Sequence, residues 1–285
     1  MADSKALLRL PGRGEFIDRH SLIVRVTHWI NVLCVTVLLM SGLHIFNAWP
    51  RLHWGQVSGS SADALFEIGS RRDADGRLAG FTRIFGHEFV TTGVLGVSAD
   101  ARGVMQGRAF PEWATLPGPY WLPMAREWHF FFAWLFVLNG LVYLLHTVCG
   151  HHLRRDLLPD RSDLAGLGRS FVDHLRLRHP TGTGALRYNP LQKLAYLVVI
   201  FMLLPLMTLA GWALSPWLDA VLPGWVNLLG GRQAARTLHF AMACLLCAFV
   251  LVHVFEVLAS GVWNQLRSML TGRYRLPGDD HDRRA

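Results

Sequence analysis

Charged residues are scarce in this sequence. They make up 17% of its 285 residues, whereas hydrophobic residues make up 52%. A soluble domain normally carries about 25% charged residues, so this composition argues against a soluble globular protein. It predicts an integral membrane protein instead. The net charge of +8 then reflects arginines that flank membrane helices, and we expect no nucleic-acid partner.

Cysteine is scarce too, and it forms no recognisable site. The four cysteines all lie in or beside apolar stretches: Cys34, Cys149, Cys244 and Cys247. Their positions indicate neither a disulfide framework nor a zinc site. The absence of a Cys-x-x-Cys-His motif excludes covalently attached c-type haem. The first 21 residues also lack an apolar segment, so we expect the first spanning helix to serve as the export signal.

Four apolar runs are each long enough to cross a membrane, which requires roughly 20 residues of helix. They cover residues 22–46, 127–149, 191–214 and 237–260. None shows the alternation that a membrane-spanning strand requires. We therefore predict an all-α fold, a single four-helix membrane domain over residues 1–285. A long connection, residues 47–126, joins the first two helices.

The distribution of charge predicts the orientation of the helices. Basic residues are concentrated before the first run, between the second and third runs, and after the fourth. Because such residues favour the cytoplasmic side, we expect both termini in the cytoplasm of a bacterial inner membrane. The 47–126 connection has balanced charge and is then periplasmic. Its tryptophans and prolines suggest a folded cap or a docking surface.

Histidines are unexpectedly frequent in the apolar runs. Ionisable residues at membrane depth are rare unless they bind a ligand or pair inside the bundle. Six histidines lie within the runs: His28, His44, His129, His146, His239 and His253. His239 and His253 are 14 residues apart, which in a helix corresponds to nearly the same face and to depths about 21 Å apart. Neutral imidazole is an axial ligand of haem iron, so one helix can present one ligand to each of two haems.

Matching depths predict the partners of these two ligands. His28, near the cytoplasmic start of the first helix, matches His253. His129, near the periplasmic start of the second helix, matches His239. The sequence thus predicts two non-covalent haem b groups, one near each membrane face. Depth leaves two alternative haem ligands open: His44 on the periplasmic side and His146 on the cytoplasmic side.

An arginine precedes three of the predicted ligands by three residues, on the same side of the helix. These are Arg25, Arg126 and Arg236. A guanidinium one turn outward from the ligand could pair with a haem propionate. Gly42 and Gly140 lie nearly in phase with the ligands of their helices, where the missing side chain would let a haem approach the backbone.

The sequence resembles the diheme b-type cytochrome membrane subunits of the bacterial cytochrome b561 type. These include the subunits of nickel-iron hydrogenase and formate dehydrogenase-N, and relatives encoded with thiosulfate-reductase-type molybdoenzymes. The resemblance rests on Arg25-Val26-Thr27-His28-Trp29, on Trp128-His129-Phe130-Phe131 and on the spacing of the last two ligands. It implies that the four selected histidines hold haem. The segment Tyr188–Lys193 resembles a quinone-contacting segment, which implies that Asn189, and less directly Gln192, binds quinone.

The predicted function is electron transfer between the quinone pool and a periplasmic redox protein, which the resemblance implies is a molybdopterin oxidoreductase. No catalytic residue is predicted. One alternative is a self-contained membrane oxidoreductase that meets a small periplasmic molecule such as superoxide at the outer haem. Another is a haem-free transporter whose histidines form a proton or metal path.

Overall fold

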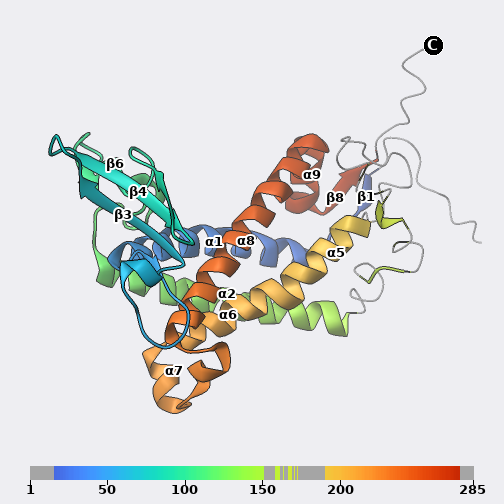
Figure 1. Cartoon of the computed structure of the whole chain (residues 1–285). Coiled ribbons are helices and arrows are strands. Elements are labelled where there is room, and N and C mark those ends of the chain that lie inside the picture. The colour runs from blue at the N-terminus through green and yellow to red at the C-terminus, as the bar shows by residue number, and fades with distance from the viewer. Residues whose placement is uncertain are drawn as a thin grey trace, which may run out of the picture. The chain divides into compact units, whose positions relative to one another are not determined.

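The computed structural model describes residues 16–150 and 190–276, together with some residues between 158 and 172. Within this part of the chain, four helical segments are long and apolar enough to cross a membrane. They are α1 (Leu22–Ala48), α2 (Leu122–Cys149), the third segment Pro190–Ala213, and α8 (Arg232–Ala259) (Figure 1). The prediction of four helices able to span a membrane is confirmed.

Two of the spans, α2 and α8, begin five residues before their predicted starts, because each helix continues outward beyond the predicted apolar run. Pro123 lies in the first turn of α2, where a missing N–H costs nothing. At the start of α8, the carbonyl of Gly55 accepts hydrogen bonds from the N–H groups of Gln233 (3.0 Å) and Ala234 (3.1 Å). A helix otherwise leaves these first N–H groups unsatisfied.

The third span is not a uniform α-helix. It consists of α5 (Pro190–Val198), a π-helical segment η5 (Val199–Leu203) and α6 (Leu204–Ala213). Pro205 lies two residues after the end of the π segment. Proline cannot donate to the preceding turn and its ring crowds the carbonyl there, so the helix widens locally instead of breaking.

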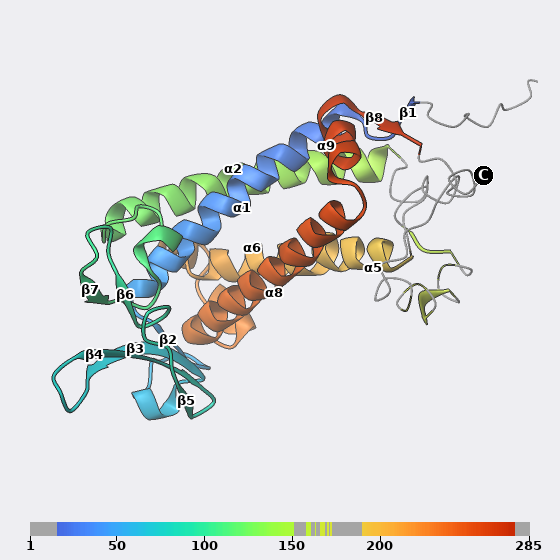
Figure 2. The same cartoon turned by 90° about the horizontal axis from the view of Figure 1, so that it is seen from above.

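The connection between α1 and α2 contains strands, so the all-α prediction is wrong for this part. We call residues 49–121 the insert. Its elements are β2 (Arg51–Leu52), η1 (Ser61–Asp63), β3 (Phe66–Arg72), β4 (Leu78–Ile84), β5 (His87–Val90), β6 (Val97–Ala99), β7 (Met105–Gly107) and η2 (Glu112–Ala114). Strands β2, β3, β4 and β5 pair in that order as an antiparallel sheet, and β6 pairs with β7 (Figures 1 and 2). The strands are short and only half-buried, which is why the hydrophobic pattern did not reveal them.

The sheet of the insert packs its apolar face against the ends of α1 and α8. The buried core consists of Phe46, Leu52, Ile68 and Ala109, with Phe66, Leu95, Phe110 and Phe240 packed against it. The rings of Phe46 and Phe240 stack with centroids 4.8 Å apart. The insert therefore shares one core with two spanning helices.

Hydrogen bonds also attach the insert to the first turns of α8. The Thr237 hydroxyl donates to the carbonyl of His53 at 2.7 Å. The Arg236 guanidinium donates to the carbonyl of Trp49. Both residues lie within three positions of His239, so the insert helps to fix the part of α8 that carries this histidine.

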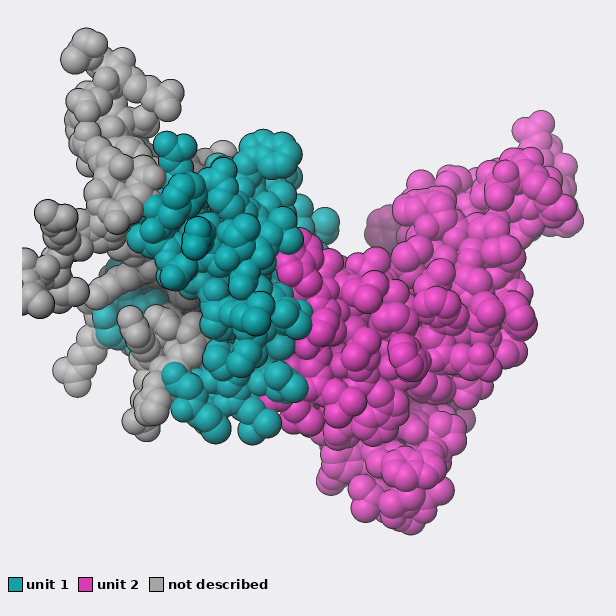
Figure 3. All heavy atoms as spheres, turned by 180° about the vertical axis from the view of Figure 1, so that it is seen from behind, with its two compact units in different colours: residues 1–28, 142–199, 248–285 teal, residues 29–141, 200–247 magenta. Residues whose placement is uncertain are grey.

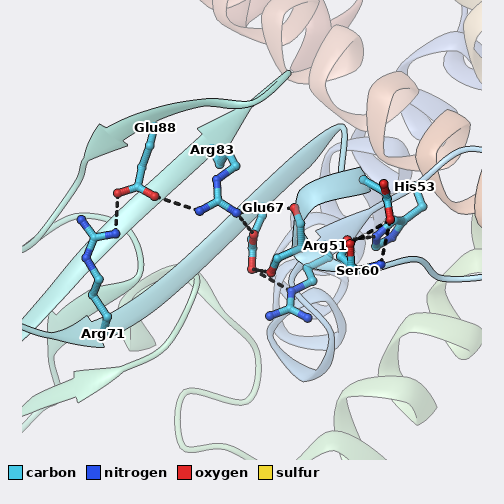
Figure 4. Close-up of polar contacts among 9 residues, drawn as sticks. Arg51, His53, Ser60, Glu67, Arg71, Arg83 and Glu88 are labelled. Atoms are coloured by element: carbon cyan, nitrogen blue, oxygen red, sulfur yellow. Dashed lines mark hydrogen bonds and ion pairs between the residues drawn. The ribbon is translucent and has the colours of Figure 1, made fainter.

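A ladder of alternating charge crosses the other face of the sheet (Figure 4). Directly opposed positions on four strands hold Arg51, Glu67, Arg83 and Glu88. The Glu67 carboxylate, whose side chain is 3% exposed, accepts from Arg51 at 2.7 Å and from Arg83 at 2.9 Å. Arg83 and Arg71 also bind Glu88, and the hydrogen bond from Arg83 holds the pKa of the Glu88 carboxyl below its ordinary value.

The chain divides into two compact units (Figure 3). Unit 1 contains residues 1–28, 142–199 and 248–285, and unit 2 contains residues 29–141 and 200–247. Unit 1 also holds the helix α9 (Val262–Thr271) and the strand pair of β1 (Phe16–Asp18) with β8 (Arg273–Arg275), which lie close to α9 in Figure 2. Unit 2 holds the insert, α7 (Pro216–Val221) and η6 (Trp225–Leu229).

Candidate functional site

Unit 2 brings two of the predicted ligands close together. The rings of His129 on α2 and His239 on α8 have centroids 6.2 Å apart and are inclined by 73°. The Nδ1 atom of His239 lies 3.0 Å from the carbonyl of Met207, and the Nδ1 atom of His129 lies 3.0 Å from the Ser41 hydroxyl. Each ring is therefore held from behind through Nδ1, and we call this pair the outer pair.

Unit 1 brings together the other two predicted ligands, which we call the inner pair. The rings of His28 on α1 and His253 on α8 have centroids 6.4 Å apart and are inclined by 60°. Phe249, one turn before His253, stacks on its ring with centroids 5.9 Å apart. Tyr196 of α5 contacts the edge of Phe249 in turn. A stack of aromatic rings thus supports the inner pair.

Both separations suit two imidazoles that share one metal ion. A bond between a metal and an imidazole nitrogen is about 2 Å long, and the ring centre lies about 1 Å behind that nitrogen. Two axial imidazoles on one iron therefore have ring centres roughly 6 Å apart. The observed values of 6.2 and 6.4 Å match this spacing, whereas imidazoles in direct hydrogen-bonding contact would be closer. The residues present fit two bis-histidine haem sites.

Glycines make room for the outer pair. A Cβ atom at Gly42 would lie 3.3 Å from Cε1 of His129, and one at Gly211 would lie 3.1 Å from Cε1 of His239. Both contacts are tighter than ordinary packing, so each imidazole rests against a helix backbone that only glycine leaves open. Among the described residues, nothing lies within 4 Å of a Cβ atom at Gly140, and the approach of a haem to this position stays a prediction.

The alternative ligand His44 has a different role. Its side chain is completely buried, its Nδ1 atom lies 2.9 Å from the carbonyl of Pro117, and its Nε2 atom accepts from the N–H of Trp121 at 3.0 Å. A carbonyl only accepts, so Nδ1 carries the proton and both ring nitrogens are satisfied. His44 ties α1 to the end of the insert and offers no lone pair to a metal.

The second alternative, His146, lies at the end of α2 in unit 1. Its Nε2 atom is 3.2 Å from the hydroxyl of Ser21. The same hydroxyl accepts from the N–H of Val24 in the first turn of α1. His146 therefore contacts the start of α1, and this hydrogen bond to Ser21 does not bring it to a second histidine.

The three predicted propionate arginines differ in their contacts. Arg25 donates to the carbonyl of Leu270 at 2.6 Å, and Arg236 donates to a carbonyl of the insert. Arg126 is exposed and lies over the ring of Phe130, 5.9 Å from its centroid. A guanidinium has five N–H donors, so one bond to a carbonyl leaves the others available to an anion. The propionate role stays a prediction for all three.

Two residues beside the outer pair and one in the insert were not predicted from sequence. Ser41 and Gly211 contact the two rings directly. Arg108 of the insert donates to the hydroxyl of Thr115 at 2.6 Å, and burial lowers the pKa of its guanidinium. Ser41 and Gly211 could have been suspected from sequence only because each is a small residue in an apolar run, at the same membrane depth as a predicted ligand. Nothing in the sequence pattern singles out Arg108.

The predicted quinone residues are only partly described. Asn189 lies outside the described residues. Gln192 lies in the first turn of α5 and is half-buried. Its neighbour Lys193 is buried and forms an ion pair with Asp163, with 2.7 Å between Nζ and Oδ2. A buried ion pair therefore lies next to the predicted quinone segment.

Comparison with known proteins agrees with this arrangement. Residues 19–272 match the family described as prokaryotic cytochrome b561. A relative from Azospira oryzae, provisionally named a protein-methionine-sulfoxide reductase subunit, YedZ1, is 29% identical over 248 residues. The match covers 85% of this chain and 91% of the relative. No solved structure matches the chain. The chain belongs to the prokaryotic cytochrome b561 family, whose members bind haem b and transfer electrons across membranes.

Proposed function

We propose that this protein holds two haem b groups, with His129 and His239 at an outer site and His28 and His253 at an inner site. The observation that carries the proposal is the presence of two separate imidazole pairs with ring centres 6.2 and 6.4 Å apart. Each haem, when bound, supplies a one-electron carrier. The protein supplies the axial nitrogens, their orientation and a low-polarity surrounding.

The electrons pass between a periplasmic redox protein and the quinone pool. The charge distribution supports a location in the bacterial inner membrane, with both termini and the inner pair on the cytoplasmic side. The insert is then periplasmic, and it is the folded part of the chain that a soluble partner can reach. The family assignment favours this electron-transfer role over a haem-free transporter.

We propose that the periplasmic partner is an oxidoreductase of the molybdopterin class. The name of the Azospira oryzae relative supports a partner that is a reductase of oxidised methionine in proteins. The family resemblance supports the molybdopterin class. A folded insert attached to α8 beside His239 supports docking near the outer site.

The contact at Gly211 provides a test of the outer site. In Gly211→Ala the added methyl would lie 3.1 Å from Cε1 of His239 and 3.3 Å from Nδ1. The ring must then move by a few tenths of an ångström, which stretches its bond to the Met207 carbonyl. We expect altered low-spin ferric EPR signals from one haem and a partial loss of that haem during purification.

The matched control for this variant is Thr208→Ala on the same helix. The Thr208 hydroxyl bonds the carbonyl of Leu204, four residues earlier, and the substitution should leave both EPR signals unchanged. An unchanged spectrum and haem content in Gly211→Ala would show that the His239 ring does not hold a haem against α6.

The quinone site is tested by quinol-driven reduction of the haems. Asn189 is proposed to donate a hydrogen bond to a quinone carbonyl, as the family resemblance implies. We expect Asn189→Ala to slow the initial rate of haem reduction by quinol at least about fivefold, because one lost hydrogen bond to a bound polar group costs about 1–3 kcal/mol. Reduction by dithionite should stay complete in the variant.

Asn227→Ala serves as the control, since this asparagine lies in unit 2 and its side chain accepts from Gln56. It should reduce at the rate of the unaltered protein. Equal quinol rates in Asn189→Ala and in the unaltered protein would place quinone binding elsewhere. Fast reduction of either haem by superoxide, with no response to quinol, would instead favour a self-contained oxidoreductase.

A further inference from the structure

The Ser41 hydroxyl lies behind the ring of His129. The Ser41 side chain is completely buried in unit 2. Its Oγ atom lies 2.7 Å from the carbonyl of Val37, 3.3 Å from the carbonyl of Leu38, and 3.0 Å from Nδ1 of His129. A hydroxyl has one proton to donate and two lone pairs with which to accept.

The distances indicate the direction of each hydrogen bond. The shortest contact is the one to the Val37 carbonyl, which can only accept, so the hydroxyl proton of Ser41 goes there. Ser41 must then accept from Nδ1–H of His129. In a neutral imidazole this leaves Nε2 with the lone pair, which is the form that binds a metal. Ser41, together with the Leu38 carbonyl that is also hydrogen-bonded to His129, thus favours this tautomer.

The two imidazoles of the outer pair are held by different acceptors. His239 donates from Nδ1 to the carbonyl of Met207 at 3.0 Å, which is a backbone group of α6. His129 donates to a side-chain hydroxyl, and it is also hydrogen-bonded to the backbone carbonyl of Leu38. An acceptor behind a ligating imidazole increases the basicity of the ligand, and a more basic ligand favours the oxidised metal. Of these acceptors, only Ser41 can be removed by substitution of a side chain.

We propose that Ser41 is a positioning residue that orients His129 and lowers the midpoint potential of the outer haem. This inference rests on the proposed outer haem site. The spacing of the histidines does not select Ser41. The inference assigns control of the midpoint potential of the outer haem to a residue of α1, a helix that contributes no axial ligand at the outer site. The effect is exerted through the imidazole of His129, whose Nδ1 atom is hydrogen-bonded to Ser41.

The test is a redox titration of the purified full-length protein, followed optically, with Ser41→Ala compared with the unaltered protein. We expect the oxidation equilibrium of one haem to shift threefold to tenfold toward the reduced form. For a one-electron couple this is an increase of about 30–60 mV. The other haem should keep its potential. The haem whose potential shifts should be the one that His253→Ala retains.

Thr36→Ala is the matched control on the same helix. The Thr36 hydroxyl donates to the carbonyl of Val32 at 2.8 Å, as Ser41 does to Val37, but Thr36 is exposed. Its loss removes the same kind of helix bond and should leave both potentials unchanged. Ser41→Cys keeps nearly the same volume with a weaker acceptor, and should produce a smaller increase than Ser41→Ala.

The outcomes separate this inference from the proposed function. Haem content is measured first, and fewer than two haems in the unaltered protein contradicts the proposed function itself. If two haems are present and neither Ser41 variant shifts a potential, the inference is overturned. If Ser41→Ala loses the outer haem, the redox titration of Ser41→Cys is the test instead. An increased potential of the outer haem in Ser41→Cys supports the inference, and an unchanged potential overturns it.

Discussion

Replacing His253 with alanine should remove the inner haem alone and leave one haem per chain. The inner pair lies in unit 1 and the outer pair lies in unit 2, so each site keeps its own two imidazoles when a ligand of the other is lost. His129→Ala should produce the converse, with loss of the outer haem and retention of the inner one. Pyridine haemochrome assay against protein concentration gives the count, and the double variant should contain no haem.

His44→Ala is the matched control, because His44 is an intramembrane histidine whose ring nitrogens are both bonded to backbone groups. It should keep two haems, although it removes a buried side chain and lowers the free energy of unfolding. The opposite pattern, with one haem in His44→Ala and two in His129→Ala, would show that the outer site uses His44.

Glu67→Ala should destabilise the insert by about 3 kcal/mol. Removing one partner of a buried ion pair leaves the other charge uncompensated, which typically costs about 3–5 kcal/mol. Glu67 is almost fully buried, but Arg51 and Arg83 are partly exposed, so the lower end of this range applies. Ser61 also loses the carboxylate to which it donates at 2.9 Å. Thermal unfolding in detergent, combined with limited proteolysis of the insert, measures the effect.

Glu88→Ala is the control for this substitution, because it removes the same kind of residue from the outer end of the ladder. Glu88 is partly exposed, and surface ion pairs contribute little to stability. The insert should then resist proteolysis nearly as well as in the unaltered protein. Equal susceptibility of the two variants would show that the buried position of Glu67 has no special role in the stability of the sheet.

The two histidine pairs of the proposed haem sites could be selected from the sequence because helix periodicity and bilayer thickness constrain their positions strongly. The 14-residue spacing of His239 and His253 defines one helix face at two depths. Antiparallel topology then selects His129 and His28 as partners, and the structure brings these pairs together. The choice against His44 could not be made from depth. It depends on the Pro117 carbonyl, which a loop distant in sequence brings to the ring.

The insert could not be predicted at the same level. Its strands have two to seven residues, and β5 is exposed at every position, so alternation along the sequence is weak. The opposition of Arg51, Glu67, Arg83 and Glu88 depends on strand register, which turns determine and composition does not. The contact of Ser41 with His129 could not be predicted either, because it depends on which faces of α1 and α2 pack against each other.

The most direct test of the two-haem account is a reduced-minus-oxidised spectrum of the purified protein together with its haem count. The account predicts two haem b groups per chain, both low-spin because each iron has two imidazole ligands. A count of one would contradict the assignment of separate outer and inner pairs. A protein that is folded but contains no haem would contradict the account altogether.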